Sequence, residues 1–353
     1  MAGMRVLVAM SGGVDSSVAA ALVSDAGHEV VGATMKLWGG PSDSGCCSVS
    51  DVEDARRAAR RRGIDHHVFN FSEEFEASVV EPYVADHFAG RTPNPCVECN
   101  RHLKFAAFVE RAVRLGFDSV ATGHHARVVR EGSGRPRLLR GHDGAKDQSY
   151  VLSCLTAAQL DRVLLPIGEL DKREVRRLAA ERGLEVATKP DSQEVCFVAG
   201  PKGPASRRRF LEERGTLHPA RLVEARSGKV VGAVPAIELV TVGQRRGLGV
   251  TVGERRFALD VDLASAVVFV GDESDLAARG VPLSRRTWVA DPLSDGCEVL
   301  AQASAHGTPF AAVLEPGGLR FAEPHRRIAP GQLVALYVGD EVVGSGVAMR
   351  AAA

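Results

Sequence analysis

Residues 5–20 read RVLVAMSGGVDSSVAA, which is an apolar run, a glycine pair and then a segment rich in Ala and Val. The apolar run predicts a strand over Arg5–Met10, and the segment from Ser17 to Asp25 has helical character. Two glycines allow a tight turn that presents backbone N–H groups to a phosphate, and Ser16 and Ser17 lie where the helix dipole favours anions. The stretch therefore predicts a strand, a phosphate-binding loop and a helix.

The loop differs from the best-known phosphate-binding loop of nucleotide enzymes. A Walker A loop, GxxxxGK[ST], requires a lysine, and this loop has none.

Further strands and helices alternate over the first two hundred residues. Strands are predicted over Glu29–Leu37 and Ile64–Phe71, a helix over Ser50–Arg62, and a fourth strand ends at Ser119–Thr122. Such alternation is typical of βαβ units, which form a parallel sheet covered on both faces. Ligands of these sheets bind beyond the C-terminal ends of the strands.

The pattern changes near Gly200–Arg209, which is predicted to be a loop or linker. Beyond it, short β-rich runs recur at intervals of roughly ten residues, the pattern of small antiparallel barrels. We therefore expect three domains: an α/β catalytic domain over 1–204, a small central β-rich domain over 205–281 and a C-terminal β-barrel over 282–353.

Composition limits the class of protein. The 353 residues carry 44 basic and 44 acidic side chains, so no overall positive field attracts nucleic acid. No run approaches the roughly 20 apolar residues of a membrane span, and Met1–Arg5 leads into a strand without a signal peptide. Seven cysteines, an odd number, favour reduced thiols over a secreted disulfide framework. The chain is expected to be cytoplasmic, without a membrane partner.

Three cysteines lie in segments that suggest chemistry. Cys96 and Cys99 form a CxxC in a proline-containing loop, before a helix predicted to start near Leu103, and Cys196 follows a loop with lysine and proline. Thiols near a helix N-terminus tend to be reactive, but one CxxC alone leaves redox, metal-binding and packing roles open.

Other cysteines and a histidine pair are assigned structural roles. Cys154 is predicted to be buried in a helix, Cys297 to lie in or beside a barrel strand, and the vicinal Cys46 and Cys47 to be non-catalytic. His124 and His125 are expected to be solvated loop residues rather than metal ligands.

Six motifs occur in order: SGGVDSS (11–17), TPNPCVECN (92–100), ATGHHAR (121–127), KDQSYVL (146–152), DSQEVCFV (191–198) and TVGQRRGLG (241–249). The first resembles the PP-loop of ATP pyrophosphatases. Together the six resemble the tRNA-specific 2-thiouridylases, over nearly the whole chain. The resemblance implies an ATP- and Mg²⁺-dependent sulfurtransferase of the PP-loop fold that makes 2-thiouridine at the wobble position of tRNA.

The resemblance also implies an ATP site at the PP-loop. ATP is cleaved between its α and β phosphates, so that a carbonyl oxygen is adenylated and pyrophosphate is released. Asp15 would help place Mg²⁺. The implied ATP-binding residues are Ala9, Met10, Ser11, Gly12, Gly13, Val14, Asp15, Ser16, Ser17, Met35 and Gly123, the last because its backbone approaches the nucleotide.

By the same resemblance, Cys99 is the first catalytic cysteine and Cys196 carries a persulfide. The oxygen on C2 of uridine is a poor leaving group, and adenylation makes AMP the leaving group that sulfur displaces. Cys99 then either attacks the persulfide to release sulfide or forms a transient Cys99–Cys196 disulfide.

One position departs from the family pattern, which has Asp where this chain has Cys96. Asn94, Pro95 and Cys96 are the implied contacts of the target base, with Cys96 as acid/base or as a third thiol. Cys96, Cys99 and Cys196 together could instead hold an iron–sulfur cluster.

The implied tRNA contacts are Lys146, Asp147 and Gln148 before a helix, and the basic turn of Gln244, Arg245 and Arg246. The family's Arg-Tyr-like pair in the barrel is replaced by Ser304 and Ala305. The expected partners are tRNA with Lys, Glu or Gln acceptors and a sulfur donor such as a cysteine desulfurase or relay protein. The alternatives are another PP-loop adenylating enzyme and a non-catalytic RNA-binding or iron–sulfur protein.

Overall fold

The computed structural model describes residues 3–38, 48–130, 132, 134–191, 195–198, 200, 203–250 and 256–351. The vicinal pair Cys46 and Cys47 lies outside these residues.

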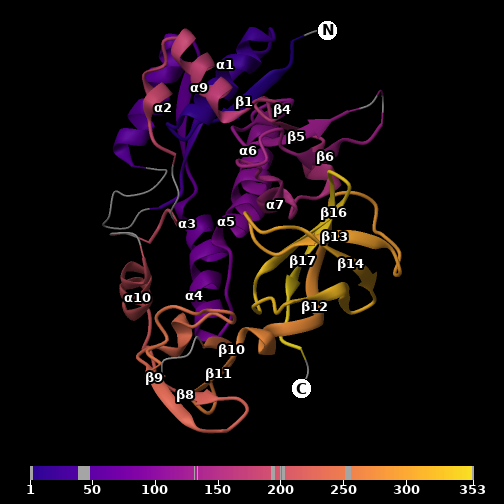
Figure 1. The fold of residues 1–353 in the computed structure, drawn as a ribbon. Coiled ribbons are helices and arrows are strands. Elements are labelled where there is room, and N and C mark those ends of the chain that lie inside the picture. Colours follow the sequence, from indigo (N-terminus) through magenta and orange to yellow (C-terminus); the bar gives the residue numbers. More distant parts are fainter. Residues whose placement is uncertain are drawn as a thin grey trace.

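The N-terminal part is built on a five-stranded, fully parallel sheet, which confirms the predicted α/β fold (Figure 1). The strand order is β3-β2-β1-β4-β7. The strands are β1 (Arg5–Ala9), β2 (Glu29–Lys36), β3 (Asp65–Asn70), β4 (Ser119–Ala121) and β7 (Val163–Leu164).

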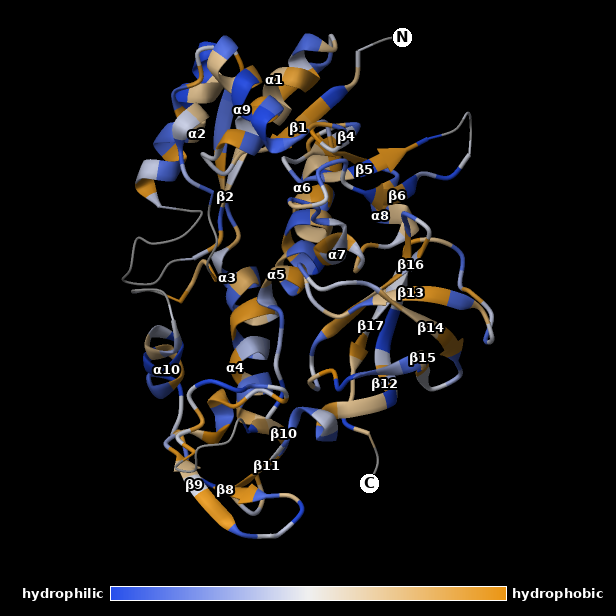
Figure 2. Cartoon of the chain, viewed as in Figure 1, coloured by the Kyte–Doolittle hydropathy of each residue, from blue (hydrophilic) through white to orange (hydrophobic). Residues whose placement is uncertain are grey.

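The two faces of this sheet are covered by different helices. Val6 and Val8 of β1 pack against α1 (Val14–Asp25), α2 (Val49–Arg61) and α9 (Lys172–Glu181). Leu7 and Ala9 pack on the other face, in a cluster with side chains of the helical segment that ends in α6 (Phe108–Arg114). Figure 2 shows β1 and much of α1 as hydrophobic, as a strand buried on both faces requires.

The CxxC sequence lies in a helix and not in the predicted loop. Helix α5 (Pro95–Glu98) continues as a π-helix, η2 (Cys99–Ala107), into α6. The prediction of a start near Leu103 was wrong because Asn94 is a helix cap: its Oδ1 accepts hydrogen bonds from the backbone N–H groups of Cys96 (3.2 Å) and Val97 (3.4 Å). Pro95 then occupies the first helical position, which tolerates proline.

The remaining helical elements of this part are short. They are α3 (Ser72–Phe75), the π-helix η1 (Glu76–Val80), α4 (Glu81–Phe88), α7 (Ser149–Leu152), α8 (Ala157–Leu160) and the 3-10 helix η3 (Glu185–Thr188). Cys154 is buried, but it lies two residues after α7 and not within a helix.

The segment predicted as a linker contains a helix, α10 (Pro204–Glu212), again with proline near its start. After it comes a four-stranded sheet in the order β10-β11-β8-β9. Its strands are β8 (Ala220–Glu224), β9 (Val230–Val234), β10 (Phe257–Asp262) and β11 (Val267–Gly271). The expected antiparallel pattern holds for two pairings, whereas β8 and β11 are parallel. Two 3-10 helices, η4 (Ile237–Leu239) and η5 (Glu273–Leu276), flank these strands.

The C-terminal part is a closed six-stranded barrel, as predicted. The strands follow the order β12-β15-β14-β13-β16-β17, and a β12–β17 pairing closes the circle. They are β12 (Ala277–Trp288), β13 (Glu298–Gln302), β14 (Phe310–Glu315), β15 (Gly318–Arg326), β16 (Leu333–Val338) and β17 (Glu341–Ala348). Cys297 lies directly before β13, as expected.

A hairpin from the N-terminal part extends the barrel sheet. It consists of β5 (Ala126–Val129) and β6 (Arg137–Arg140), and β6 pairs with β17. Buried side chains reinforce this junction: the Tyr150 hydroxyl donates to the Leu333 carbonyl (2.9 Å) and the Ser345 hydroxyl to the Ser153 carbonyl (2.8 Å). The barrel is thus bonded directly to the sheet domain.

Among the described residues, none of the helices combines the length and apolarity that crossing a membrane requires.

Replacing Leu138 by Ala tests the packing of the hairpin. Leu138 lies on β6, is fully buried and belongs to the large core cluster. We expect Leu138→Ala to lower the free energy of unfolding by about 2–5 kcal/mol, because it removes buried methyl groups and leaves a cavity. Leu115→Ala is the matched control, since Leu115 is 49% exposed, and its effect should stay within about 0.5 kcal/mol. Urea unfolding followed by circular dichroism measures both, and equal effects would contradict the packing.

Candidate functional site

A cleft of about 810 Å³ opens at the C-terminal ends of β1, β2 and β4. Its walls come from five segments. They are the PP-loop, the CxxC helix (α5 with its continuation η2), the 145–151 segment, the 189–191 segment and a barrel loop containing Ala305 and His306. The predicted ATP-binding residues that line it are Ala9, Met10, Ser11, Gly13, Val14, Asp15, Ser16, Met35 and Gly123. Gly12 and Ser17 do not line it.

Serine hydroxyls organise the PP-loop. The backbone N–H of Ser11 donates to Ser16 Oγ (3.2 Å), and the Ser16 hydroxyl donates to the Gly13 carbonyl (3.2 Å). The Ser17 hydroxyl also donates to the Gly13 carbonyl (2.9 Å), which accounts for its position outside the cleft. The loop is therefore held in shape at the start of α1, where the helix dipole attracts anions.

Two glycines are required by close backbone approaches. A Cβ on Gly123 would lie 2.5 Å from the Ser16 nitrogen, so this glycine lets the end of β4 pack against the PP-loop itself. Gly12 has a φ of +72°, and a Cβ there would lie 2.1 Å from the Asp51 carbonyl oxygen. Both glycines fix the shape of the loop, and Gly12 does so from outside the cleft.

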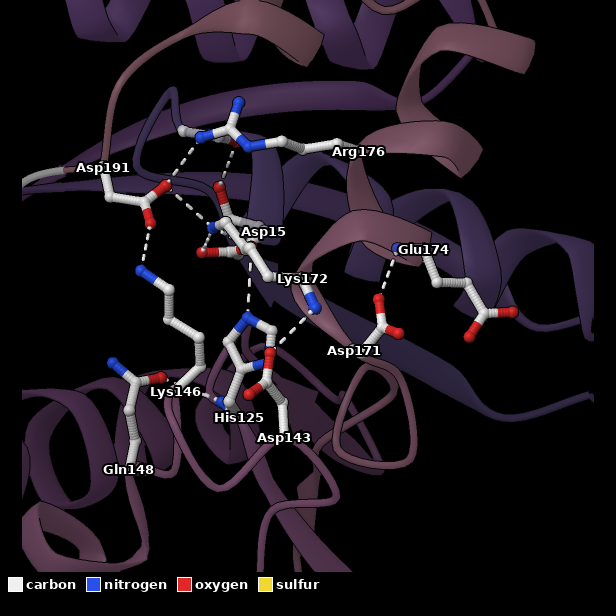
Figure 3. Close-up of polar contacts among 12 residues, drawn as sticks. Asp15, His125, Asp143, Lys146, Gln148, Asp171, Lys172, Glu174, Arg176 and Asp191 are labelled. Carbon is white, nitrogen blue, oxygen red and sulfur yellow. Dashed lines mark hydrogen bonds and ion pairs between the residues drawn. The ribbon is translucent and has the colours of Figure 1, made fainter.

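A chain of ion pairs crosses the cleft beside the loop (Figure 3). The Lys172 ammonium lies 2.7 Å from both carboxylate oxygens of Asp15 and 2.8 Å from Asp191 Oδ1. Asp191 also accepts hydrogen bonds from Lys146 (2.8 Å) and Arg176 (2.9 Å). Lys172, at the start of α9, thus joins the PP-loop to the segment that precedes Cys196.

Both carboxylates are held in the ionised form. Burial acts to raise the pKa of Asp15, but hydrogen bonds from His125 and Lys172 and their charges bring it below its ordinary value. Burial likewise opposes ionisation of Asp191, yet hydrogen bonds from Lys146 and Lys172 lower its pKa to about 2.

A second lysine fastens the same segment to the loop. The Lys189 ammonium donates to the Gly12 carbonyl (3.0 Å) and to the carboxylates of Asp51 and Asp54 (2.5 Å each). Neither Lys172 nor Lys189 belongs to one of the six sequence motifs. The one available signal was the position of Lys189 and Pro190 directly before the DSQEVCFV motif.

The prediction of solvated histidines was wrong, because His124 and His125 are both buried at the end of β4. His124 Nδ1 and the Thr122 hydroxyl are hydrogen-bonded at 2.8 Å, and burial lowers the pKa of His124 well below its ordinary value. His125 Nε2 lies 3.3 Å from Asp15 Oδ1. His125 therefore supports the loop through Asp15, and both histidines line the cleft.

The thiols differ in their access to the cleft. Cys96 is exposed and lines the cleft, next to Asn100 on the same helix. Cys99 is buried and Cys196 half-buried; both pack in the same hydrophobic cluster and neither lines the cleft. Burial raises the pKa of the Cys154 thiol to about 12, consistent with its predicted packing role. Of the predicted target-base contacts, Cys96 alone lines the cleft; Asn94 caps its helix and Pro95 is buried.

The predicted tRNA contacts fall into two places. Lys146, Asp147 and Gln148 line the cleft and also have internal partners: Asp147 accepts from the Ser149 backbone N–H (3.0 Å), and Gln148 Oε1 accepts from the His125 N–H (2.8 Å).

The second group lies outside the cleft. Arg245 and Arg246 are exposed, while the Gln244 side chain closes its own turn: Oε1 accepts from the Thr241 N–H (3.0 Å) and Nε2 donates to the Arg246 carbonyl (2.9 Å).

Within the described part of the chain, no three His, Cys, Asp or Glu side chains meet so as to hold a metal ion. Asp15 nevertheless suits Mg²⁺ in an ATP complex, where one or two carboxylates commonly suffice beside the phosphates.

Family models match the chain in three consecutive regions. They are described as the tRNA methyl transferase HUP domain (residues 4–200), the tRNA methyl transferase PRC-barrel domain (208–272) and the aminomethyltransferase beta-barrel domain (279–348). Among solved structures, a 4-thiouridine synthetase–RNA complex with bound ATP is 21% identical, with a TM-score of 0.38 over 60% of this chain and 50% of that chain.

Curated relatives match almost end to end. The tRNA-specific 2-thiouridylase MnmA of Saccharopolyspora erythraea is 45% identical over 98% of this chain and 99% of its own length. The protein of the same name from Geobacter metallireducens is 44% identical over 97% and 96%. Since these identities extend through all three regions, the chain belongs to the tRNA-specific 2-thiouridylase family.

Proposed function

We propose that the protein is an ATP-dependent tRNA 2-thiouridylase that adenylates O2 of the wobble uridine and replaces this oxygen by sulfur. The observation that carries the proposal is the composition of the cleft. The PP-loop and the CxxC helix, with Cys96, line one cavity of about 810 Å³, so a nucleotide and a base between them can react without leaving it. Family membership supports the same reaction.

The ATP half-reaction is assigned to the PP-loop side. The loop N–H groups and the start of α1 bind the pyrophosphate part of ATP, and Met35 borders the adenine. If Asp15 binds a cation instead of Lys172, the N–H groups of the Lys172 ammonium become available to donate to phosphate. When bound at Asp15 with ATP, Mg²⁺ would neutralise charge on the departing pyrophosphate.

The sulfur half-reaction is assigned to Cys196 and Cys99. The terminal sulfur of a Cys196 persulfide attacks C2 of the adenylated uridine, and the C2–O bond to AMP breaks. Cys99 thiolate then attacks the Cys196 sulfur and the S–S bond breaks, which leaves a thiolate on C2. Protonation of the base at N3 then gives the C2=S bond of 2-thiouridine. This oxidises the two thiols to a Cys99–Cys196 disulfide, which an external thiol reductant returns to the reduced state.

Cys96 is the residue of this group that already faces the cleft, and we assign it the acid/base position beside the target base. The described thiols do not form a group of three that could hold a metal, so no step is assigned to an iron–sulfur cluster. The sulfur donor is a persulfide carrier such as a cysteine desulfurase or relay protein, and the tRNA is one with a Lys, Glu or Gln acceptor.

The direct test is nucleoside mass spectrometry of unmodified tRNA after anaerobic incubation with the protein, Mg-ATP, a cysteine desulfurase and cysteine. We expect the wobble uridine to gain sulfur in place of oxygen, and only when ATP is present. Pyrophosphate release without thiolation would favour another PP-loop adenylating enzyme. If neither thiolation nor pyrophosphate release occurs, both enzymatic functions are wrong and a non-catalytic RNA-binding protein is favoured.

Removing either assigned thiol should separate the two half-reactions. We expect Cys99→Ser and Cys196→Ser each to abolish thiolation while tRNA- and ATP-dependent pyrophosphate release continues, because adenylation needs no thiol. Cys297→Ser is the control, since Cys297 is half-buried directly before β13 and does not belong to the hydrophobic cluster that holds Cys99 and Cys196. Loss of pyrophosphate release in the two variants would refute the assignment.

Replacing Lys172 should affect the ATP step. The Lys172 side chain is 11% exposed between Asp15 and Asp191, whereas the neighbouring Arg173 is 95% exposed. We expect Lys172→Met to slow pyrophosphate release by about 100-fold, the effect of losing a preorganised charge at a reacting centre. Arg173→Met, which removes one positive charge from the same helical turn, should stay close to the original rate. Similar losses in both variants would show that only the overall charge matters.

A further inference from the structure

Glu98, which directly precedes Cys99, is bound by the C-terminal barrel. Arg285 Nη2 on β12 donates to Glu98 Oε2 at 3.0 Å, and the Glu98 side chain is 17% exposed. Arg101 Nε and His102 Nε2 lie 3.6 Å and 3.2 Å from the same oxygen. Burial acts to raise the pKa of Glu98, but the His102 hydrogen bond and the charges of Arg285 and Arg101 bring it below its ordinary value. A carboxylate therefore sits ionised beside the thiols.

A second contact joins the same two elements. Arg101 Nη1 donates to Thr287 Oγ1, also on β12, at 2.9 Å. The Arg101 side chain is 16% exposed, and its Nε and Nη2 have no hydrogen-bond partner among the described residues. A guanidinium buried in this way is costly without a compensating charge, so Glu98 and Thr287 together determine where it lies.

The β12 backbone is distorted where it makes these contacts. Arg285 has a φ of +47°, and the β12–β17 register shifts between Ser284 and Thr287. A left-handed conformation is unfavourable for a residue with a side chain, and such bulges redirect side chains. The redirected residues, Arg285 and Thr287, form hydrogen bonds with Glu98 and Arg101 of the CxxC helix.

The CxxC helix needs an external anchor. Helix α5 has four residues, and the π-helix η2 begins at Cys99 itself. π-Helical segments are rare and recur at functional sites, and here the change of helical register falls between the two thiols. Without outside contacts, the change could occur elsewhere and the thiols would rotate.

Building on the proposed function, we propose that Glu98 is a positioning residue for sulfur transfer. Arg285 donates a hydrogen bond to Glu98, and Thr287 accepts one from Arg101, which lies beside Glu98. Through these two contacts the barrel fixes helix α5 and hence the positions of Cys96 and Cys99. Arg285 and Thr287 then contribute to the chemistry of the thiols without lining the cleft themselves.

The test uses Glu98→Gln, Arg285→Gly and the double variant in the full chain. Glycine is chosen because it adopts a positive φ freely, so Arg285→Gly removes the side chain without straining the bulge. Arg285→Lys is the conservative variant. Arg320→Ala is the matched control, because Arg320 forms an exposed ion pair with Glu315 (2.7 Å) elsewhere on the barrel.

Three readouts are compared: the rate at which iodoacetamide alkylates Cys99, followed by mass spectrometry of tryptic peptide 92–101; kcat for thiolation; and KM for ATP. We expect each single variant to raise Cys99 alkylation and to lower kcat by about three- to tenfold, the size of a contact coupling, with KM for ATP unchanged. The double variant should be no worse than either single one, and Arg285→Lys should recover part of the loss.

Unchanged Cys99 alkylation in both single variants, or fully additive losses in the double variant, would overturn the proposal. A rise in KM for ATP parallel to the fall in kcat would also overturn it, since general loosening would then explain the effects. If the unaltered protein failed to thiolate tRNA while Cys99 alkylation still responded as expected, the proposed function would fail and the anchoring of the thiols by the barrel would stand.

Discussion

The arrangement of the cleft depends on one ammonium group shared by two carboxylates. Asp15 belongs to the PP-loop and Asp191 to the segment leading to Cys196, and their negative charges would repel across the cleft. Lys172 Nζ lies 2.7 Å from Asp15 and 2.8 Å from Asp191. Both carboxylates are attracted to this ammonium group, which holds the two segments together. Removing the cation would cost Asp15 its lysine partner and leave it beside His125, while Asp191 would keep Lys146 and Arg176. Breaking a partly buried ion pair in this way costs more than losing a surface ion pair.

Sequence predicted the parts of the fold that local pattern determines. The apolar run before Ser11 and the glycine pair suffice for strand, loop and helix, and the alternating later runs suffice for the barrel. The errors fall where a single cap or a tertiary contact decides. Asn94 begins a helix by accepting two backbone hydrogen bonds, and His125 is buried with its Nε2 beside Asp15, which is 110 residues away in the sequence. In the sequence, nothing distinguishes Lys172 from another lysine at a helix start, because only the folded chain places Asp15 and Asp191 beside it.

The barrel is part of the site rather than an appendage. The β5–β6 hairpin joins the barrel sheet, and Arg140 on β6 lies over the Tyr337 ring while donating to Asp147 and Gln302. Ala305 and His306 complete the cleft wall. This barrel loop therefore contributes to the shape of the site and to the exclusion of water from it.

The ion pairs also explain why a neutral chain can have a phosphate site. Lys146, Lys172 and Lys189 all line the cleft, and each is already paired with Asp191, Asp15 or Asp51. The net charge of zero therefore gives no sign of the three lysine ammonium groups that line the cleft, where phosphate would bind. An anion entering the cleft must compete with these carboxylates, so part of its binding free energy is spent on breaking ion pairs. We expect such a site to favour a polyphosphate over a weakly charged anion, because a polyphosphate offers enough negative charge to replace several carboxylates at once.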